Sequence, residues 1–261
     1  MGILVPRPDL KTTFNTVASL YDEVRPGYPD ELVRDVLDLS GMDRSGKVLE
    51  VGCGTGQASR LFAVLGCEMI CLDIGQDLIE VARARLNNYK NVRFVLCPFE
   101  DWDSASKFDL VISATAFRWV SPKVRFIRAR DALKAGGSLA IFSNQHVRKD
   151  EGFFAEVQEV YSKHYVVSGS PRDPSTLTTS ASPEPGTTAF ADPIHRVYAW
   201  TANYSAEQYI KLISTYSDHI ALPESNRMHL FDGIADLINK NYGGSITKHY
   251  ETALAFRRKE P

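Results

Sequence analysis

Strand-like and helix-like segments alternate along the first half of the chain. Apolar runs with strand character occupy residues 48–51, 68–73, 92–96, 108–113 and 138–143. Apolar residues recur at helical spacing in 30–37, 57–65, 77–86 and 121–133. The last of these helices is expected to start with Ser121 as N-cap and Pro122 at the first helical position, and Gly136 and Gly137 separate it from the fifth strand. This alternation predicts a parallel sheet with helices on both faces.

The second half has a different pattern. Helical spacing returns in residues 153–165 and 227–239, a third helix is expected to begin at Ser205, and strand-like runs cover 194–200 and 246–256. Residues 168–193 hold five of the 13 prolines among many serines and threonines, so we expect a loop that is too long for a passive connector. The two late strands would complete a seven-stranded sheet, and the helices between them would form a lid.

A glycine-rich turn follows the first predicted strand. Residues 47–56 read KVLEVGCGTG, so Gly52, Gly54 and Gly56 lie between a strand and a helix. Glycine is needed where a ligand approaches the backbone closely, because a Cβ would block that approach. A turn of this kind at the carboxyl end of a parallel strand is a ligand cradle.

The spacing of these glycines distinguishes two classes of ligand. In the dinucleotide fingerprint G-x-G-x-x-G the third glycine stands one residue later, where this chain has Gln57. Glu50 lies two residues before Gly52, and a negative group beside the turn suits a cationic ligand better than a pyrophosphate. Asp73 ends the second strand, 21 residues after Gly52, and can accept hydrogen bonds from both ribose hydroxyls. The pattern therefore predicts a nucleoside site that favours a positive charge.

The pattern E-x-G-x-G-x-G at residues 50–56 resembles the first motif of class I S-adenosylmethionine-dependent methyltransferases. The likeness covers roughly residues 20–145 and is closest to the small-molecule branch that includes the trans-aconitate and ubiquinone-biosynthesis methyltransferases. Segments 21–29 (YDEVRPGYP) and 114–119 (ATAFRW) carry this closer resemblance. It implies an α/β fold with a Rossmann-like, doubly wound, mostly parallel seven-stranded sheet and a helical lid. It also implies S-adenosyl-L-methionine as the cofactor.

On this basis we expect four parts along the chain. Residues 1–29 would form an arm that covers cofactor and substrate, and 30–145 the cofactor-binding core. Residues 146–245 would form the helical lid with a late strand and the flexible loop 168–193, and 246–261 the final strand of the core sheet. Alternatively, segment 21–29 is a proline-rich surface arm without a binding role.

The resemblance also assigns binding roles to individual residues. It implies that Glu50 and the turn hold the methionine end of the cofactor, that Asp73 holds the ribose, and that the adenine contacts Phe99 and its neighbours. The full set of expected cofactor-binding residues is Tyr21, Arg25, Glu50, Gly52, Cys53, Gly54, Gly56, Asp73, Ile74, Phe99, Glu100 and Ser113. The acceptor would lie against Phe117, Arg118, Trp119 and His146. Core packing is the alternative role for Phe117 and Trp119.

Two departures from the family pattern affect these expectations. Arg118 stands where the family usually has histidine, which removes the obvious general base, so no catalytic residue is assigned. Cys97 and Pro98 replace the usual Gly-Asp pair, so adenine recognition would use the backbone, Phe99 and Glu100 as fallback acceptor.

The expected acceptor is a small molecule, with a carboxylic acid as the first hypothesis. A carboxylate is already ionised and needs no base, and Arg25, Arg118 or Arg148 would bind it by bidentate hydrogen bonds. Two other classes of function remain. One is a binding protein that holds S-adenosylmethionine without turnover, and the other is a nucleotide-dependent oxidoreductase, which Gln57 and Glu50 disfavour.

The composition of the chain limits which kinds of binding partner are expected. The chain has 261 residues and a net charge of −2, so no basic surface indicates nucleic acid. No apolar run has the length of a transmembrane helix and no signal pattern opens the chain, so we expect a cytoplasmic protein without a membrane partner. The four cysteines form no C-x-x-C pair, which fits reduced thiols, and the six histidines lack metal-ligand spacing. A monomer or homodimer without a bound metal is expected.

Overall fold

The computed structural model describes residues 18–103, 105–147, 151–165 and 184–260. Contacts divide the chain into two compact units. Among the described residues, unit 1 holds 18–25, 146–147, 151–165 and 200–250, and unit 2 holds 26–103, 105–145, 184–199 and 251–260. Residues 1–17 of the expected arm, Arg148 and residues 168–183 of the expected loop lie outside the described part.

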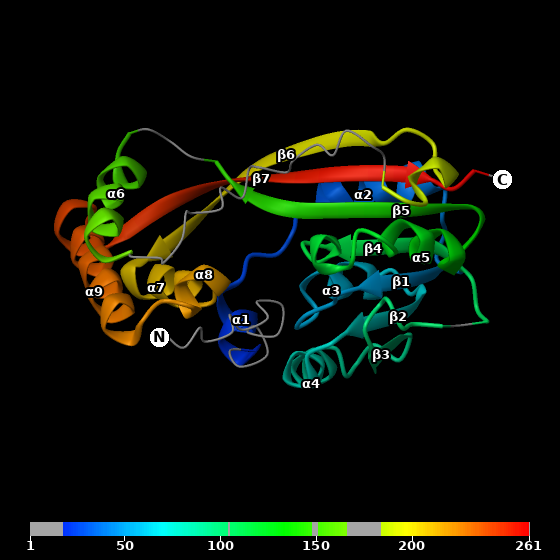
Figure 1. Cartoon of the computed structure of the whole chain (residues 1–261), viewed down its shortest axis with the longest axis horizontal. Helices are drawn as coiled ribbons and strands as arrows, with labels where there is room; N and C mark the ends of the chain where they lie inside the picture. The colour runs from blue at the N-terminus through cyan, green and yellow to red at the C-terminus, as the bar shows by residue number, and fades with distance from the viewer. Residues whose placement is uncertain (1–17, 104, 148–150, 166–183, 261) are drawn as a thin grey trace, which may run out of the picture. The chain divides into compact units, whose positions relative to one another are not determined.

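The strands form one seven-stranded sheet in the order β3-β2-β1-β4-β5-β7-β6 (Figure 1). The strands are β1 (Lys47–Val51), β2 (Glu68–Asp73), β3 (Val92–Leu96), β4 (Phe108–Ala114), β5 (Leu133–His146), β6 (Ile194–Ser205) and β7 (Ser245–Arg258). The pairs β1·β2, β1·β4, β2·β3 and β4·β5 are all parallel. This order confirms the predicted seven-stranded, mostly parallel α/β sheet, in which the connection between β3 and β4 reverses the direction of strand addition.

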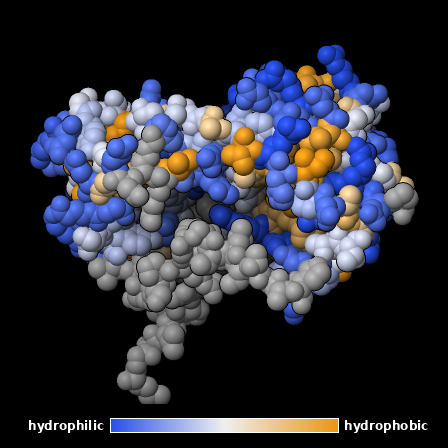
Figure 2. Space-filling model, turned by 90° about the horizontal axis from the view of Figure 1, so that it is seen from above, coloured by the Kyte–Doolittle hydropathy of each residue, from blue (hydrophilic) through white to orange (hydrophobic). Residues whose placement is uncertain are grey.

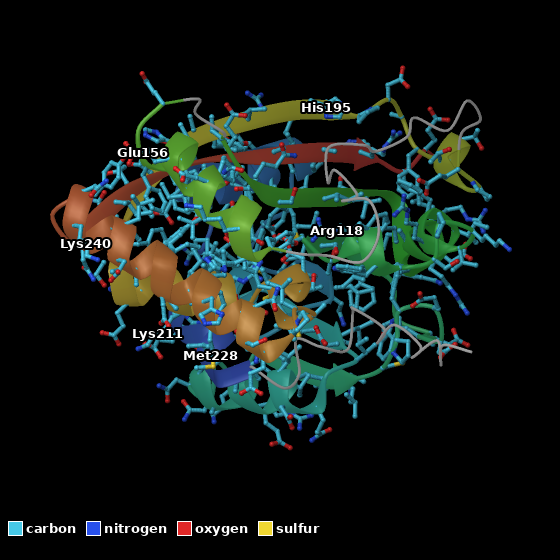
Figure 3. The ribbon with its side chains drawn as sticks, turned by 60° about the vertical axis from the view of Figure 1, so that its left-hand side comes forward. Arg118, Glu156, His195, Lys211, Met228 and Lys240 are labelled. Atoms are coloured by element: carbon cyan, nitrogen blue, oxygen red, sulfur yellow. The ribbon has the colours of Figure 1, made fainter. Side chains whose placement is uncertain are left out.

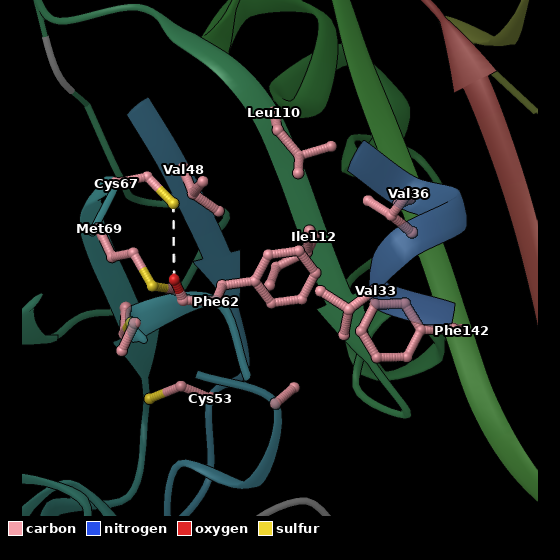
Figure 4. Packing of buried hydrophobic residues seen from close by; sticks show 14 of the residues in the cluster. Val33, Val36, Val48, Cys53, Phe62, Cys67, Met69, Leu110, Ile112 and Phe142 are labelled. Atoms are coloured by element: carbon pink, nitrogen blue, oxygen red, sulfur yellow. Dashed lines mark hydrogen bonds between the residues drawn. The ribbon is translucent and has the colours of Figure 1, made fainter. Parts of the chain in front are cut away.

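Alternate residues of the unit 2 strands face two separate hydrophobic clusters. On one face, Val48, Met69, Leu110 and Phe142 pack against helices α2 (Asp30–Ser40), α3 (Gln57–Ala63) and α4 (Gln76–Arg85), as Figure 4 shows for part of this cluster. On the other face, strand residues such as Leu49, Leu72 and Leu139 pack with Phe126 and Ala129 of α5 (Arg125–Ala132). Because side chains alternate along a strand, the near-continuous apolar runs seen in the sequence fill both faces.

Unit 1 has its own hydrophobic cluster. Its described helices are α1 (Ala18–Val24), α6 (Phe153–His164), α7 (Ala206–Ser214), α8 (Ser217–Ile220) and α9 (Glu224–Asn241). Their buried apolar residues pack with one another and with residues of β6 and β7. Helix α7 begins as predicted, because the Ser205 side chain accepts from the Gln208 N–H and the Gln208 side chain accepts from the Ser205 N–H.

Several predicted boundaries were wrong. Helix α5 begins at Arg125, because Ser121 to Val124 form a turn, and the N-cap Val124 makes no side-chain bond. Strand β5 begins at Leu133 and runs through the two glycines, with a register shift between Phe108 and Leu110 on its partner β4. Helices α1 and α8 and the short 3₁₀ helices η2 (Phe117–Trp119) and η3 (Thr187–Ala189) had no predicted counterpart.

The surface seen in Figure 2 is mostly hydrophilic, with hydrophobic residues in separate patches. No helix in the described part of the chain is both long and apolar enough to cross a membrane. Within the same described ranges, no group of three or more His, Cys, Asp or Glu side chains is arranged to hold a metal ion.

Candidate active site

The glycine turn joins the carboxyl end of β1 to α3. Gly52, Gly54 and Gly56 all have positive φ, at 72°, 55° and 89°. The N–H groups of Gly52 and Cys53 both donate to the Leu72 carbonyl at 2.9 Å, and the Gly56 N–H donates to the Cys53 carbonyl at 3.0 Å. The turn is therefore fixed to the end of β2 by its own backbone, and three left-handed residues leave room only for glycine.

The three glycines are needed for different reasons. A Cβ on Gly52 would stand 2.2 Å from the Cβ of Ala116, in the segment after β4. A Cβ on Gly56 would stand 3.1 Å from Leu86, at the end of α4. A Cβ on Gly54 would approach nothing closer than the Gln57 side chain at 3.9 Å. Gly52 and Gly56 thus allow close packing, while Gly54 leaves open space above the backbone, as a ligand cradle requires.

Asp73 lies at the end of β2 and holds the turn. Its Oδ2 accepts from the Gly54 N–H at 2.8 Å and its Oδ1 accepts from the Gly75 N–H at 2.9 Å. Its side chain is mostly buried, and burial raises the pKa of the carboxyl while these backbone donors oppose that shift. Each carboxylate oxygen has two lone pairs, so two acceptor positions remain for other hydroxyl groups.

Glu50 is fully buried on β1. It shares a sheet face with its register partners Cys71 and Ile112, and its Oε2 accepts from the Ser59 hydroxyl of α3 at 2.5 Å. Its Oε1 has no hydrogen-bond partner among the described residues. Burial raises the pKa of this carboxyl to about 7, although the hydrogen bonds from Ser59 and Cys71 oppose the shift. A buried acceptor without a donor favours a positively charged or hydrogen-donating neighbour.

Thr115 has an unusual backbone conformation, and no role was assigned to it from the sequence. It follows β4 directly and is the non-glycine residue with a positive φ, 65°, in the described chain. Its N–H donates to the Phe142 carbonyl at 2.7 Å, and its hydroxyl lies 2.9 Å from that of Tyr28. A β-branched residue in this conformation is strained, and such strain concentrates at functional sites. Segments 21–29 and 114–119, which contain Tyr28 and Thr115, were both noticed in the sequence, but neither of these two residues was given a role.

The residues expected around the adenine differ in exposure. Phe99 is 4% exposed and packs in the core cluster with Leu72 and Phe117, so its ring is not at the surface. Ile74, in contrast, is 40% exposed directly after Asp73, and Leu96, the register partner of Asp73 on β3, is 49% exposed. The adenine contact of Phe99 stays a prediction, and Ile74 and Leu96 offer apolar surface at the strand ends. Leu96 was missed because a strand pattern does not show which end is exposed.

Three other expected residues make contacts within unit 2. The fully buried Ser113 donates to the Val51 carbonyl at 2.8 Å and so joins β4 to β1. Glu100 accepts at Oε1 from the Ser121 N–H at 3.0 Å. Cys53 is buried beneath the turn, and burial raises the pKa of its thiol well above the ordinary range. These contacts give each residue a structural role, and their contact with the cofactor stays a prediction.

The segment after β4 carries three of the expected acceptor residues. Phe117 is buried and packs edge to face on Phe126 at 5.2 Å, which supports the core-packing alternative. Arg118 is exposed, with its guanidinium 5.1 Å from the centre of the Trp119 ring (Figure 3). Of the three, Arg118 and Trp119 are the ones that present surface.

The remaining expected residues belong to unit 1. Arg25 donates to the Thr215 hydroxyl and carbonyl, each at 2.9 Å. His146 is exposed, and its ring packs on Phe154 at 4.5 Å. Tyr21 lies in α1, but its side chain is outside the described residues. The structure therefore groups the turn, Asp73 and the segment after β4 in unit 2, and Arg25 and His146 in unit 1.

The acceptors, apolar surface and accessible backbone of unit 2 fit S-adenosylmethionine. Asp73 retains acceptor positions suited to a ribose diol, Ile74 and Leu96 supply exposed apolar surface, and Gly54 leaves the backbone accessible. The neighbouring acid Glu50, whose Oε1 has no donor among the described residues, disfavours an anionic pyrophosphate beside the turn. The arrangement can orient an adenosyl ligand that carries positive charge.

Comparison with known proteins agrees with this geometry. Residues 48–137 match the family model of a methyltransferase domain. The chain is 27% identical over 237 residues to an uncharacterized methyltransferase of Mycobacterium tuberculosis, covering 89% of this chain and 88% of that protein. It is 29% identical over 155 residues to the probable S-adenosylmethionine-dependent methyltransferase CRG1 of Saccharomyces cerevisiae, covering 58% of this chain. The chain spans about half, 52%, of the length of that yeast relative.

Two further similarities are to a relative with a named acceptor and to a solved structure. The chain is 30% identical over 158 residues to a malonyl-[acyl-carrier protein] O-methyltransferase of Acetivibrio thermocellus, covering 58% of this chain and 55% of that protein. The solved structure of a putative type II methyltransferase from Anaeromyxobacter dehalogenans superposes with a TM-score of 0.66 at 21% identity, covering 90% of this chain and 97% of that one. Residues 48–137 thus match a methyltransferase domain, and the glycine turn, Asp73 and the likeness to an S-adenosylmethionine-dependent relative indicate S-adenosylmethionine as the cofactor.

Proposed function

We propose that the chain transfers the methyl group of S-adenosylmethionine to a carboxylate oxygen of a small organic acid. The observation that carries this proposal is the segment after β4, where the exposed Arg118 takes the position of the family's usual histidine and lies over Trp119. An arginine cannot serve as a general base at neutral pH, but it binds a carboxylate well. The relatedness to malonyl-[acyl-carrier protein] O-methyltransferases supports the same acceptor class.

In this proposal the protein contributes orientation. Asp73 holds the ribose, Ile74 and Leu96 contact the adenine, and the turn 52–56 fixes the methionine end. The bound cofactor supplies an electrophilic methyl group, so that a new O–CH₃ bond forms as the S–CH₃ electron pair returns to sulfur, and no proton moves. Arg118 would hold the acceptor for in-line attack, which explains why a base is unnecessary.

The test is methyl transfer from radiolabelled S-adenosylmethionine to matched panels of carboxylic acids, phenols and amines. We expect volatile methyl esters from the acids, and a KM for the acid at least about tenfold higher in Arg118→Gln, because a charge-assisted hydrogen bond is lost. Arg128→Gln, on the same side of the sheet in α5, is the control. Methylation of phenols or amines without any acid would reject the acceptor class. Cofactor binding without any turnover would favour the non-catalytic alternative.

A further inference from the structure

Unit 1 contains a buried lysine without an ion-pair partner. Lys248 lies on β7, and its side chain is 3% exposed. Its Nζ is 5.4 Å from the ring centre of Phe154, 5.7 Å from that of Tyr209 and 5.4 Å from that of Tyr250. Within the described ranges no carboxylate pairs with it, and the charged group that acts on it is Arg25. Buried lysines are rare, and they usually pair with an acid.

The rings of Tyr209 and Tyr250 lie beside this lysine, and Tyr250 pairs with a further tyrosine. The hydroxyls of Tyr204 and Tyr250 lie 3.0 Å apart and both side chains are buried. One hydroxyl of such a pair donates and the other accepts, so one phenolic proton has no acceptor among the described groups. Burial raises the pKa of Tyr250 and of Tyr209, which keeps both hydroxyls protonated. Trp200 stacks on Tyr250 at 4.5 Å and fixes that ring.

Arg25 adds a second positive charge to the same region. Besides its bonds to Thr215, its guanidinium lies 4.7 Å from the ring centre of Tyr216. Its charge lowers the pKa of Lys248 and opposes the rise in the pKa of Tyr204. We call the six residues of this region the donor cluster: Arg25, Tyr204, Tyr209, Tyr216, Lys248 and Tyr250. Each of them donates hydrogen bonds, and none carries negative charge at neutral pH.

Two opposing effects set the charge of the lysine. Burial, followed by the charge of Arg25, lowers the pKa of Lys248 to about 7. The three ring faces favour the ammonium through cation–π attraction. The nearby histidine His146 packs on Phe154, with its Nδ1 3.3 Å from the His249 carbonyl. An anion that reached the cluster would raise the pKa of Lys248 and draw a proton onto it.

We propose that Lys248 anchors a binding site for a small carboxylate within unit 1, with phenols of the donor cluster as further donors. A carboxylate accepts at both oxygens, so it can use the ammonium and the spare phenolic proton together. It would also neutralise the charge of Lys248, which pairs with no carboxylate among the described residues. This binding site does not depend on the proposed function, in which Arg118 of unit 2 holds the methyl acceptor.

The experiment is calorimetric titration with malonate, using sodium chloride at matched ionic strength as a reference. Titrations at pH 7 in two buffers of different ionisation enthalpy measure proton uptake. We expect malonate to bind with uptake of a fraction of a proton, and binding to weaken at pH 9, where Lys248 is neutral. In Lys248→Met the affinity should fall roughly tenfold or more, because a charge-assisted hydrogen bond is lost, and proton uptake at pH 7 should decrease.

Two further variants make the test decisive. Lys240→Met on α9 is the matched control, because Lys240 is 71% exposed and pairs with Asp236 at the surface (Figure 3). Tyr250→Phe keeps the ring and removes the hydroxyl, so it should weaken malonate binding even if Lys248→Met does not fold. Unchanged affinity in folded Lys248→Met or in Tyr250→Phe, or no malonate binding by the folded wild type, would overturn the proposal. S-adenosylmethionine titrated into the same samples tests the cofactor site separately.

Discussion

The glycine turn of unit 2 and the donor cluster of unit 1 each lie beside a buried ionisable group, Glu50 or Lys248, that has no oppositely charged partner among the described residues, but the signs differ. Around the turn, Glu50 and Asp73 are buried acids that hydrogen bond to backbone and hydroxyl donors. In the donor cluster, Lys248 and Arg25 lie among phenols. An isolated buried charge is costly, so each region is best explained by a ligand of the opposite sign. The two regions therefore have opposite expected responses to pH.

The largest expected effect concerns Lys248. The fall of its pKa from 10.5 to about 7 corresponds to about 5 kcal/mol. This cost is complete below pH 7, and the free energy of unfolding should rise between pH 7 and 10.5, because the folded state then binds fewer protons than the unfolded state. Urea unfolding at pH 6.5 and 9.5 should show this rise in the wild type and a smaller one in Lys248→Met. Parallel pH curves for the two proteins would contradict the assignment.

A somewhat smaller effect is expected at Gly52. In Gly52→Ala the left-handed φ and the clash with Ala116 together should destabilise the chain by about 4 kcal/mol and abolish measurable S-adenosylmethionine binding. Gly66→Ala is the control, because it has φ 87° but nothing within 4 Å of the new Cβ. Thermal unfolding and calorimetry of both variants separate strain from clash. Equal losses in the two would show that the contact with Ala116 is unimportant.

The pH response expected for Glu50 is opposite to the one expected for Lys248. Its pKa rises from 4.5 to about 7, which corresponds to about 3 kcal/mol. The folded state holds the extra proton in this window, so the free energy of unfolding should fall as pH rises from 4.5 to 7. Glu50→Gln should remove this part of the slope, measured by urea unfolding at pH 5 and 7.5. If the slope persists unchanged, the carboxyl is ionised throughout.

Asp73→Asn tests the ribose position and the turn together. An asparagine can accept from only one of the two N–H groups that Asp73 holds, and it lacks the charge that strengthens hydrogen bonds from hydroxyls. S-adenosylmethionine affinity should fall by about 2 kcal/mol, or roughly thirtyfold. The exposed Asp103→Asn should bind normally by calorimetry. Normal binding by Asp73→Asn as well would place the ribose elsewhere.

The smallest effect is expected at a helix cap of unit 1. Ser205→Ala removes the capping box of α7 and should cost about 1 kcal/mol of unfolding free energy. Ser162→Ala, at an exposed position within α6, should change stability little. In unit 2, α3 and α4 start from the glycine N-caps Gly56 and Gly75 and have no side-chain cap to lose. Denaturant titration of Ser205→Ala and Ser162→Ala checks the difference between their unfolding free energies.

The parallel part of the sheet was predictable because its signal is local. Strands β2 and β3 have the predicted bounds, since their apolar runs end at polar residues or turns. The start of α5 was wrong because a proline after a serine favours a tight turn as well as a helix, and contacts with the rest of unit 2 select the turn. Strand β5 was predicted too short because glycines usually indicate the end of a strand, although paired strands can accommodate them.

The site was predictable where a motif is continuous in sequence. The turn and Asp73 were found from spacing alone, and the structure joins them by the hydrogen bond from Gly54. Thr115 and Leu96 were missed, because backbone strain and exposure at a strand end leave no trace in one sequence. Phe99 was expected to contact the adenine, and this stays a prediction; its burial in the core could not be foreseen, because an aromatic residue after a strand fits either the core or the surface.

The sequence by itself determined the class of the protein. Periodicity, glycine spacing and two acids are local properties, and together they specify a parallel sheet with a cofactor cradle at its strand ends. The donor cluster was decided only by the tertiary structure. Its members come from the end of α1, from β6, α7 and β7, and from the residues between α7 and α8, so no sequence window contains them. Burial and the nearby charge of Arg25 arise only when these distant segments pack together, and these two properties give Lys248 its altered pKa.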